Sequence, residues 1–220
     1  MRTLVVAPHP DDEILGCGGT LLRRKAESGE LGWLIVTGII AGTNWPAEAV
    51  ERRKFEITRV TELMGFGYVY NAHLPTSELD TVPIVNLIEH FAAAFKAFQP
   101  EEVLVPHRGD AHTDHRIVSD AATACTKWFR YPSIGRVLAY ETPSETDFGL
   151  NREFAFMPNY FVNISEFLAR KLEVMAVYKS ELGAFPFPRS IDAIKALAMV
   201  RGAASGFLAA EAFQLLRERY

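Results

Sequence analysis

The sequence contains little cysteine and no long apolar run. Its two cysteines, Cys17 and Cys125, form neither a CxxC motif nor a disulfide framework. We therefore expect both to pack as small apolar side chains in a protein of the reducing cytoplasm. No stretch reaches the roughly 18 consecutive apolar residues typical of a membrane-spanning helix, and Thr3–Ala7 is too short for a secretory signal. We expect no membrane span.

Positive charge is not in excess either. The net charge of −4 argues against a nucleic-acid partner, because such proteins usually present a basic face. The basic clusters Arg23–Lys25 and Arg52–Lys54 lie in helical patterns beside acidic residues, which is typical of solvated helix faces. The sequence also lacks a P-loop, a GxGxxG fingerprint with its acidic partner, a serine nucleophile elbow and internal repeats.

Short β-branched runs alternate with longer helical patterns along the chain. The strands predicted are Thr3–Ala7, Trp33–Thr37, Tyr68–Asn71, Val103–Pro106, Val137–Tyr140 and an edge strand over Pro158–Ile164. The helices predicted are Ile14–Ser28, Ala47–Met64, Pro83–Phe98, Asp114–Arg130, a helix capped by Ser165 that runs to Leu182, and Ile191–Val200. This alternation predicts an α/β fold, a Rossmann-like three-layer sandwich with a mainly parallel sheet. We expect one domain over residues 1–220 with an irregular C-terminal third.

An acidic cluster follows the first predicted strand directly. The segment reads Ala7-Pro8-His9-Pro10-Asp11-Asp12-Glu13. Three consecutive acids repel one another unless positive charge compensates them. The N-terminus of the following helix supplies some, but it does not account for His9 or for the two prolines that restrict the backbone. A bound metal accounts for both, because it requires carboxylates and a neutral imidazole that converge on one point.

A histidine cluster follows the fourth predicted strand. Three of the six histidines, His107, His112 and His115, lie there with Asp110 and Asp114. Both clusters leave the carboxyl ends of their strands, and α/β sheets bind ligands at that edge. We therefore expect the two segments to meet in space.

These residues resemble a known family. His9-Pro-Asp-Asp-Glu13 after an opening strand, followed later by His112-Thr-Asp-His115, resembles the LmbE-like, PIG-L-type N-deacetylases. Weaker similarities extend over most of the chain, at Arg53–Glu56, Phe161–Ser165, Tyr178–Leu182, Pro188–Ser190, Arg201-Gly202 and Glu211–Phe213.

The resemblance implies a metal-dependent hydrolase. It makes His9, Asp12 and His115 the metal ligands. Three protein ligands with one position left for water are typical of catalytic zinc, so the expected cofactor is Zn2+. Two imidazoles and one carboxylate also describe non-haem iron(II) sites, and Fe2+ could occupy the same ligands.

The resemblance also implies roles for the neighbouring residues. Asp11 would be the general base that acts on metal-activated water, and Glu13 would support the loop. His112 would stabilise the oxyanion or protonate the departing amine, with Asp114 orienting it. Arg53 would contact substrate hydroxyls.

The expected reaction is removal of an N-acetyl group from an N-acetylglucosamine-type amino sugar, a small-molecule or glycoconjugate substrate. Two alternatives stay open: hydrolysis of another amide, such as a thiol conjugate, and a catalytically silent metal- or carbohydrate-binding module. The sequence is also compatible with a homo-oligomer.

Other conspicuous residues have structural interpretations. Asp110 follows Gly109 and is expected to form a turn; His107 is expected to be a structural histidine; Gly16, Gly18 and Gly19 are expected to allow helix–sheet packing.

Two loops bear on the substrate. Many relatives carry an acidic residue after the second strand, where this chain reads Val36–Gly42, so the polarity of the site on that side stays open. Ala184–Ser190 is expected to form a lid or a rim, and the sequence does not decide between them.

Overall fold

One sheet holds strands from both ends of the chain. The computed structural model describes residues 1–39 and 45–220. Its seven strands have the order β3-β2-β1-β4-β5-β7-β6. β1 to β5 pair in parallel, whereas β7 is antiparallel to both β5 and β6. The mainly parallel sheet is thus confirmed. The strands are β1 Arg2–Ala7, β2 Glu30–Gly38, β3 Tyr68–Pro75, β4 Glu102–Pro106, β5 Arg136–Tyr140, β6 Tyr160–Asn163 and β7 Ala210–Glu218.

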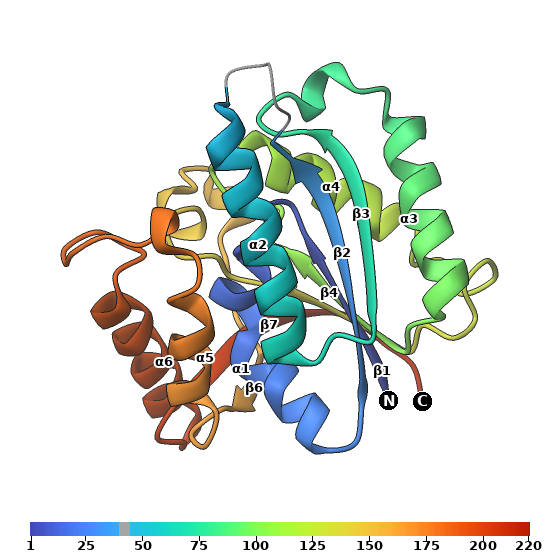
Figure 1. Ribbon diagram of the computed structural model, residues 1–220. Coiled ribbons are helices and arrows are strands. Elements are labelled where there is room, and N and C mark those ends of the chain that lie inside the picture. The colour runs from blue at the N-terminus through green and yellow to red at the C-terminus, as the bar shows by residue number, and fades with distance from the viewer. Residues whose placement is uncertain (40–44) are drawn as a thin grey trace.

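Helices cover both faces of the sheet (Figure 1). The core on one face contains side chains of α1, α2, α5 and α6, and the core on the other contains those of α3 and α4. This is the three-layer arrangement that was predicted. The helices are α1 Asp12–Ala26, α2 Ala47–Met64, α3 Ile84–Phe98, α4 Thr113–Ala124, α5 Leu168–Met175 and α6 Ile191–Ser205, with 3-10 turns at Leu79–Thr81, Thr146–Phe148, Arg152–Phe154 and Lys179–Glu181.

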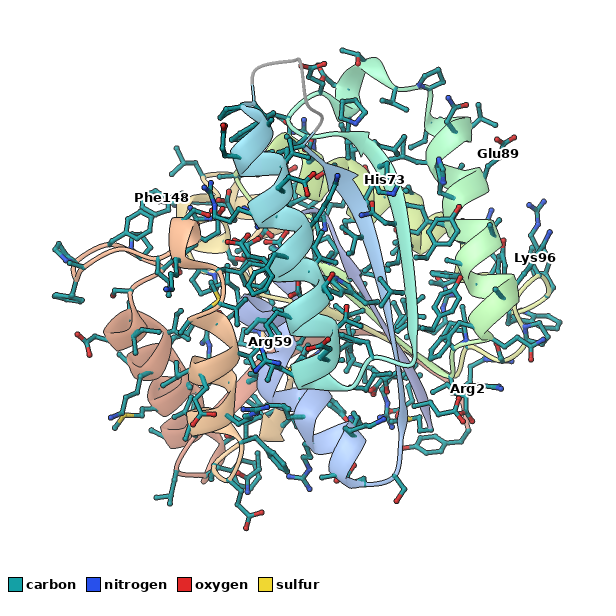
Figure 2. All side chains as sticks on the ribbon, viewed as in Figure 1. Arg2, Arg59, His73, Glu89, Lys96 and Phe148 are labelled. Carbon is teal, nitrogen blue, oxygen red and sulfur yellow. The ribbon has the colours of Figure 1, made fainter. Side chains whose placement is uncertain are left out.

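The central strands form because both of their faces can be buried. In β1, Leu4 and Val6 enter the core beneath α3 and α4, and Val5 and Ala7 enter the core beneath α1 and α2. A strand buried on both sides reads as a continuous apolar run. Side chains fill the space between the sheet and both helical layers, whereas Arg59 on α2 points outward (Figure 2). Within the described part of the chain, no helix combines the length and apolarity needed to cross a bilayer.

The strand order places the two sequence clusters side by side. β1 lies between β2 and β4. From β1 the chain adds β2 and β3 toward one edge of the sheet and then returns to add β4 and β5 on the other side of β1, so the order of the strands reverses between β1 and β4. Loops at such a switch point diverge above the carboxyl edge of the sheet and leave a crevice. Residues 8–11 and 107–112 are the loops that follow β1 and β4.

Helix α1 approaches the sheet closely because it carries glycines. A Cβ atom on Gly16 would overlap the ring of Tyr140, and one on Gly19 would lie 2.8 Å from Ile164. The Tyr140 hydroxyl also donates a hydrogen bond to the Val6 carbonyl at 2.8 Å. The predicted helix–sheet packing thus holds for Gly16, whereas Gly19 packs against the residue after β6 and Gly18 lies beside Lys171 of α5. The close approach also brings the N-terminus of α1, with its acids, close to the ends of the strands.

Several elements differ from the sequence prediction. Strand β3 extends to Pro75 and helix α6 extends to Ser205, beyond the predicted ends at Asn71 and Val200. Strand β7 was not predicted, because its second half, Gln214–Glu218, has no strand-like alternation. The helix predicted from Asp114 ends at Ala124 rather than Arg130. Just beyond this end, the Thr126 hydroxyl donates to the Thr123 carbonyl, and the Thr126 carbonyl accepts from Arg217.

The helix predicted from Ser165 to Leu182 is shorter as well. Ser165 donates to the Asn163 side chain in a turn, and α5 spans only Leu168–Met175. Tyr178 then leaves helical geometry, with φ −80° and ψ 62°, and its hydroxyl reaches Glu13. Tyr178 therefore contacts the acidic cluster from the segment that follows α5.

Replacement of Gly16 by alanine tests the close approach of α1. The added methyl group must displace the Tyr140 ring, so we expect Gly16→Ala to lower the free energy of unfolding by about 1–3 kcal/mol. Urea denaturation measures the change. Gly67→Ala is the matched control, because a Cβ at the exposed Gly67 meets only the Leu31 carbonyl at 4.0 Å. Equal stability of the Gly16→Ala variant and the wild type would contradict the packing account.

Candidate active site

The loop after β1 holds Asp11 in an unusual backbone conformation. Its φ of 142° is rare for a residue with a side chain. The Asp11 amide donates to Glu13 Oε2 at 3.0 Å, and the Tyr178 hydroxyl donates to Glu13 Oε1 at 2.7 Å. The Pro8 carbonyl, on the other side of His9, accepts from the amide and hydroxyl of Thr37. The loop is thus held from both β2 and the segment after α5.

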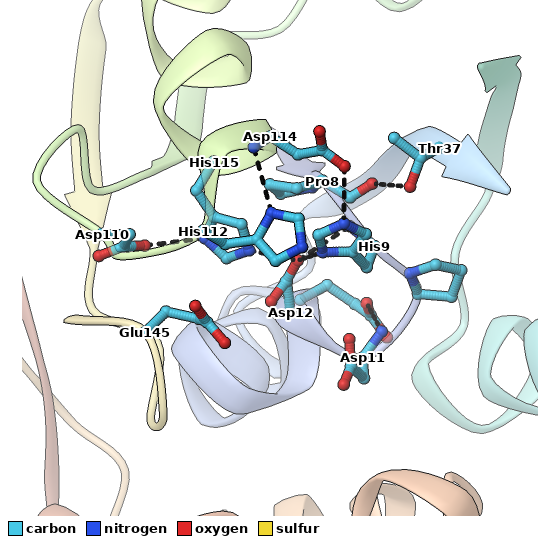
Figure 3. A network of polar contacts seen from close by, with 12 residues as sticks. Pro8, His9, Asp11, Asp12, Thr37, Asp110, His112, Asp114, His115 and Glu145 are labelled. Carbon is cyan, nitrogen blue, oxygen red and sulfur yellow. Dashed lines mark hydrogen bonds and ion pairs between the residues drawn. The ribbon is translucent and has the colours of Figure 1, made fainter. Parts of the chain in front are cut away.

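The three predicted metal ligands converge (Figure 3). Asp12 Oδ2 lies 3.3 Å from His9 Nδ1 and 3.3 Å from His115 Nε2. One ligand atom from each residue lies within 4.8 Å of the other two. Asp12 and His115 are buried, and His9 is partly exposed. Residues far apart in the chain therefore present two imidazole nitrogens and a carboxylate oxygen to one point.

The other ring nitrogen of each converging histidine contacts a carboxylate. His9 Nε2 lies 3.1 Å from Asp114 Oδ2, and His115 Nδ1 lies 2.8 Å from Asp110 Oδ2. Because these carboxylates accept, a neutral ring keeps its proton on those nitrogens, so the neutral form of each histidine has its lone pair on His9 Nδ1 or His115 Nε2. Carboxylates that orient ligating histidines are typical of metal sites. The donor set therefore fits a divalent cation, and Asp110 does more than form the predicted turn.

A second grouping, His9, His112 and Asp114, also lies within 4.8 Å. It fits a cation less well. The Asp114 carboxylate already accepts from the amides of Ser77 and Leu79, and it holds the His9 ring.

His112 caps helix α4 with its ring. Its Nδ1 accepts from the Asp114 amide at 3.1 Å, so its Nε2 carries the proton. Burial and the neighbouring imidazoles of His9 and His115 lower the pKa of His112 to about 4. The ring is therefore neutral at pH 7 and can donate a hydrogen bond. Among the described residues, the hydrogen bond between Asp114 and this ring comes from the Asp114 amide rather than from its carboxylate.

A pocket of about 290 Å³ opens beside the converging ligands. Asp11 faces this pocket, and burial together with the charge of Asp12 and Glu181 raises its pKa. Of the predicted site residues, all but Asp114 line it. Its lining is His9, Pro10, Asp11, Asp12, Thr37, Gly38, Ile39, Trp45, Arg53, Thr76, Ser77, His112, His115, Glu145, Glu181 and Arg189.

The sequence matches one protein family in the region that contains both histidine motifs. Residues 4–126 match the family described as PIG-L: GlcNAc-PI de-N-acetylase, which is more than half of the chain. The chain belongs to the PIG-L family.

Similarity to individual proteins extends over almost the whole chain. The diacetylchitobiose deacetylase of Thermococcus kodakarensis is 24% identical over 229 residues, which cover 98% of this chain and 83% of that protein. The conserved protein TT1542 from Thermus thermophilus is 30% identical, with a TM-score of 0.78 and coverage of 99% of this chain and 96% of that chain.

A third likeness concerns the fold alone. The 4-carboxy-2-hydroxymuconate hydratase GalB of Pseudomonas putida KT2440 has a TM-score of 0.79 at 16% identity, with coverage of 100% of this chain and 98% of that chain. Proteins named for different reactions therefore share this PIG-L-like fold, and the reaction must be argued from the site.

Three charged pocket residues of this PIG-L protein were not singled out from the sequence, and neither were Trp45, Thr76 and Ser77. Glu145 follows β5, and Glu181 and Arg189 come from the segment after α5. Glu181 and Arg189 lie inside Tyr178–Leu182 and Pro188–Ser190, two short segments that resemble the family in sequence, and that weak resemblance was the available signal. No comparable signal marked Glu145. Of the loop Val36–Gly42, Thr37 to Ile39 line the pocket, and residues 40–42 lie outside the described residues.

Binding of zinc to chelator-treated protein should release protons. Burial lowers the pKa of His9, but hydrogen bonds to Asp114 and Asp12 outweigh it and raise that pKa to about 9. Burial also lowers the pKa of His115, but Asp12 and Asp110 outweigh it and raise that pKa well above its usual value. The His9 ring is therefore charged at pH 7 and must lose a proton to ligate, and the raised pKa of His115 acts in the same direction, so we expect zinc binding to release protons at pH 7 and to release fewer above pH 9. Calorimetric titration in buffers of different ionisation enthalpy measures the number of protons released; identical heats in all buffers would contradict their release.

Proposed function

We propose that this protein is a metal-dependent hydrolase that removes the N-acetyl group from an amino sugar of the N-acetylglucosamine type. The observation that carries the proposal is the convergence of His9 Nδ1, Asp12 Oδ2 and His115 Nε2 beside a pocket. Asp11 and His112 face the same pocket. Membership of the PIG-L family supports the reaction class.

His9, Asp12 and His115 would hold the cation. Zinc commonly takes three such ligands and keeps a fourth position open, and iron(II) accepts the same donors. The bound cation would polarise the acyl carbonyl and lower the pKa of water.

Asp11 is suited to the role of general base. Its pKa is raised toward the working pH of an enzyme, where a carboxyl group can both accept and return a proton efficiently. Asp11 would take the proton of the attacking water and return it to the departing nitrogen. An amide nitrogen needs that proton, because an amide anion is a poor leaving group.

His112 is suited to stabilising the oxyanion. Its neutral ring offers Nε2–H to the pocket, while Nδ1 is held by the start of α4. A donor that is already oriented costs no reorganisation when charge develops, and such a donor contributes on the order of 3 kcal/mol. Asp114 would act indirectly: its carboxylate would hold the His9 ring, and its amide would orient the His112 ring.

The size and lining of the pocket support a sugar substrate. About 290 Å³ is close to the lower end of ordinary ligand sites and suits one hexose-sized group. Trp45 lines the pocket with its side chain partly exposed, and an aromatic face can stack on the apolar face of a pyranose ring. The relative from Thermococcus kodakarensis is named for a diacetylated amino-sugar disaccharide.

Two substitutions separate the roles of base and ligand. We expect Asp11→Asn to retain zinc and to lower kcat by about 10²- to 10⁴-fold, since the variant loses proton transfer. We expect His115→Ala to lose zinc, because one of three ligands disappears. Metal analysis of purified protein and an amine-release assay measure the two effects. His90→Ala is the matched control, because His90 contacts Tyr70 outside the pocket. Full activity with unchanged zinc in both variants would defeat the mechanism.

A panel of N-acylated amines tests the bond that is cleaved. We expect free acetate from N-acetylated sugars, and little acid from N-acylated thiol conjugates. Release of other acids from the thiol conjugates alone would favour the alternative amide. Sugar binding by fully metallated protein without any amine release would favour the silent binding module.

A further inference from the structure

The pocket contains two arginines, and one of them is already fully engaged. Arg53 Nη1 donates to the Pro10 carbonyl at 2.6 Å, Nη2 donates to Glu181, and Nε lies 3.3 Å from Glu56 Oε2. Its planar fork therefore holds the loop before Asp11 and has few donors left for a ligand.

Arg189 is the opposite case. Its guanidinium forms no hydrogen bond with any described residue: Asp11 Oδ2 lies 3.6 Å from Nη1, and Glu181 Oε2 lies 3.7 Å from Nη2. Both distances exceed a good hydrogen bond. Arg189 Nε is buried and has no partner among the described residues. Buried donors normally have partners, so the lone Nε marks an incompletely paired guanidinium. Its Nη1 and Nη2 groups are not buried and are available to a ligand in the pocket that Arg189 lines.

The position of Arg189 is fixed by its neighbours. Its guanidinium lies over the Phe187 ring, 5.4 Å from the centroid. The next residue, Ser190, caps α6 by accepting from the Ala193 amide at 3.1 Å, and the Ser190 amide donates to the Phe187 carbonyl. A tight turn between an aromatic platform and a helix cap thus presents the guanidinium, and ordering it costs a ligand little entropy. Through Arg189, the end of the segment Ala184–Ser190 contributes to the pocket wall.

The charges around Arg189 favour an uncharged ligand. The described residues that line the pocket include two arginines and four carboxylates, Asp11, Asp12, Glu145 and Glu181. A divalent cation would bring this set only to neutrality. Arg53 and Arg189 share Glu181, so neither offers a surplus positive charge to a phosphate. An anionic substituent would meet nearby carboxylates, and such repulsion discriminates between substrates.

We propose that Arg189 binds hydroxyl or ring oxygens of an uncharged amino-sugar glycoside, and that the pocket disfavours substrates with a phosphate beside the sugar. Arg53 is then a positioning residue that holds Pro10 and Glu181. This inference rests on the proposed function for the identity of the sugar.

Ligand-observed NMR on the zinc-loaded protein tests the inference. The probes are the methyl glycoside of N-acetylglucosamine and N-acetylglucosamine 1-phosphate. The same sample reports the Kd of each probe and any acetate released, so binding and hydrolysis are read separately. The variants are Arg189→Gln, Arg189→Lys and Arg53→Gln. Arg59→Gln is the matched control, since Arg59 is exposed and its ion pair is with Glu62 on its own helix.

The expected results distinguish the two arginines. Arg189→Gln should weaken binding of the methyl glycoside and raise its KM at least tenfold, with a change in kcat below about threefold. Arg53→Gln should lower kcat more than it raises KM. The phosphate should bind the wild type at least tenfold more weakly than the methyl glycoside. Arg189→Lys, which keeps charge but loses the fork, should be intermediate in affinity; it decides the matter if Arg189→Gln does not fold.

Several results would overturn the inference. These are unchanged affinity in both Arg189 variants, tighter binding of the phosphate, or no binding of the methyl glycoside by the wild type. If the wild type binds the glycoside but releases no acetate, the proposed function fails, and the Arg189 variants still decide which residue binds the sugar.

Discussion

The burial of three consecutive carboxylates at the end of β1 is the constraint on which the site depends. Asp11, Asp12 and Glu13 are at most 4% exposed. Charge in such surroundings is costly unless it is paired or hydrogen-bonded. The three carboxylates have different partners. Asp12 faces the two imidazoles that lower its pKa. Glu13 accepts from Tyr178 and from the Asp11 amide, yet burial still raises its pKa to about 8. Burial raises the pKa of Asp11, and the nearby charges of His9, Arg189 and Arg53 offset that burial only in part.

The rest of the fold supplies these partners from separate segments. The end of β4 and the start of α4 bring His115 and Asp114, and the segment after α5 brings Tyr178 and Arg189. The switch point between β1 and β4 brings the first two segments together. The third depends on the early end of α5, which directs Tyr178 toward Glu13. Tyr178 lies outside α5, in the segment that follows it, and donates to the acidic cluster from there.

Much of this arrangement could be predicted from the sequence, because its signals are local. Apolar runs between helical patterns predict the parallel strands, and topology then predicts that His9 and His115 approach. The partners of the ligands could not be predicted in the same way. Asp110 resembles an ordinary turn residue after Gly109, and its contact with His115 Nδ1 depends on the turn's orientation in space. Arg189 follows an aromatic and proline-rich segment with no charge pattern, and only the fold shows which donors stay unpaired.

The central claim is that His9, Asp12 and His115 bind one metal cation. A crystal structure of the protein soaked in zinc, with anomalous diffraction measured on both sides of the zinc absorption edge, tests it most directly. The account predicts one strong peak bounded by His9 Nδ1, Asp12 Oδ2 and His115 Nε2, on the side that faces the pocket. A peak between His9 Nε2, His112 and Asp114, or no peak at either position, would contradict it.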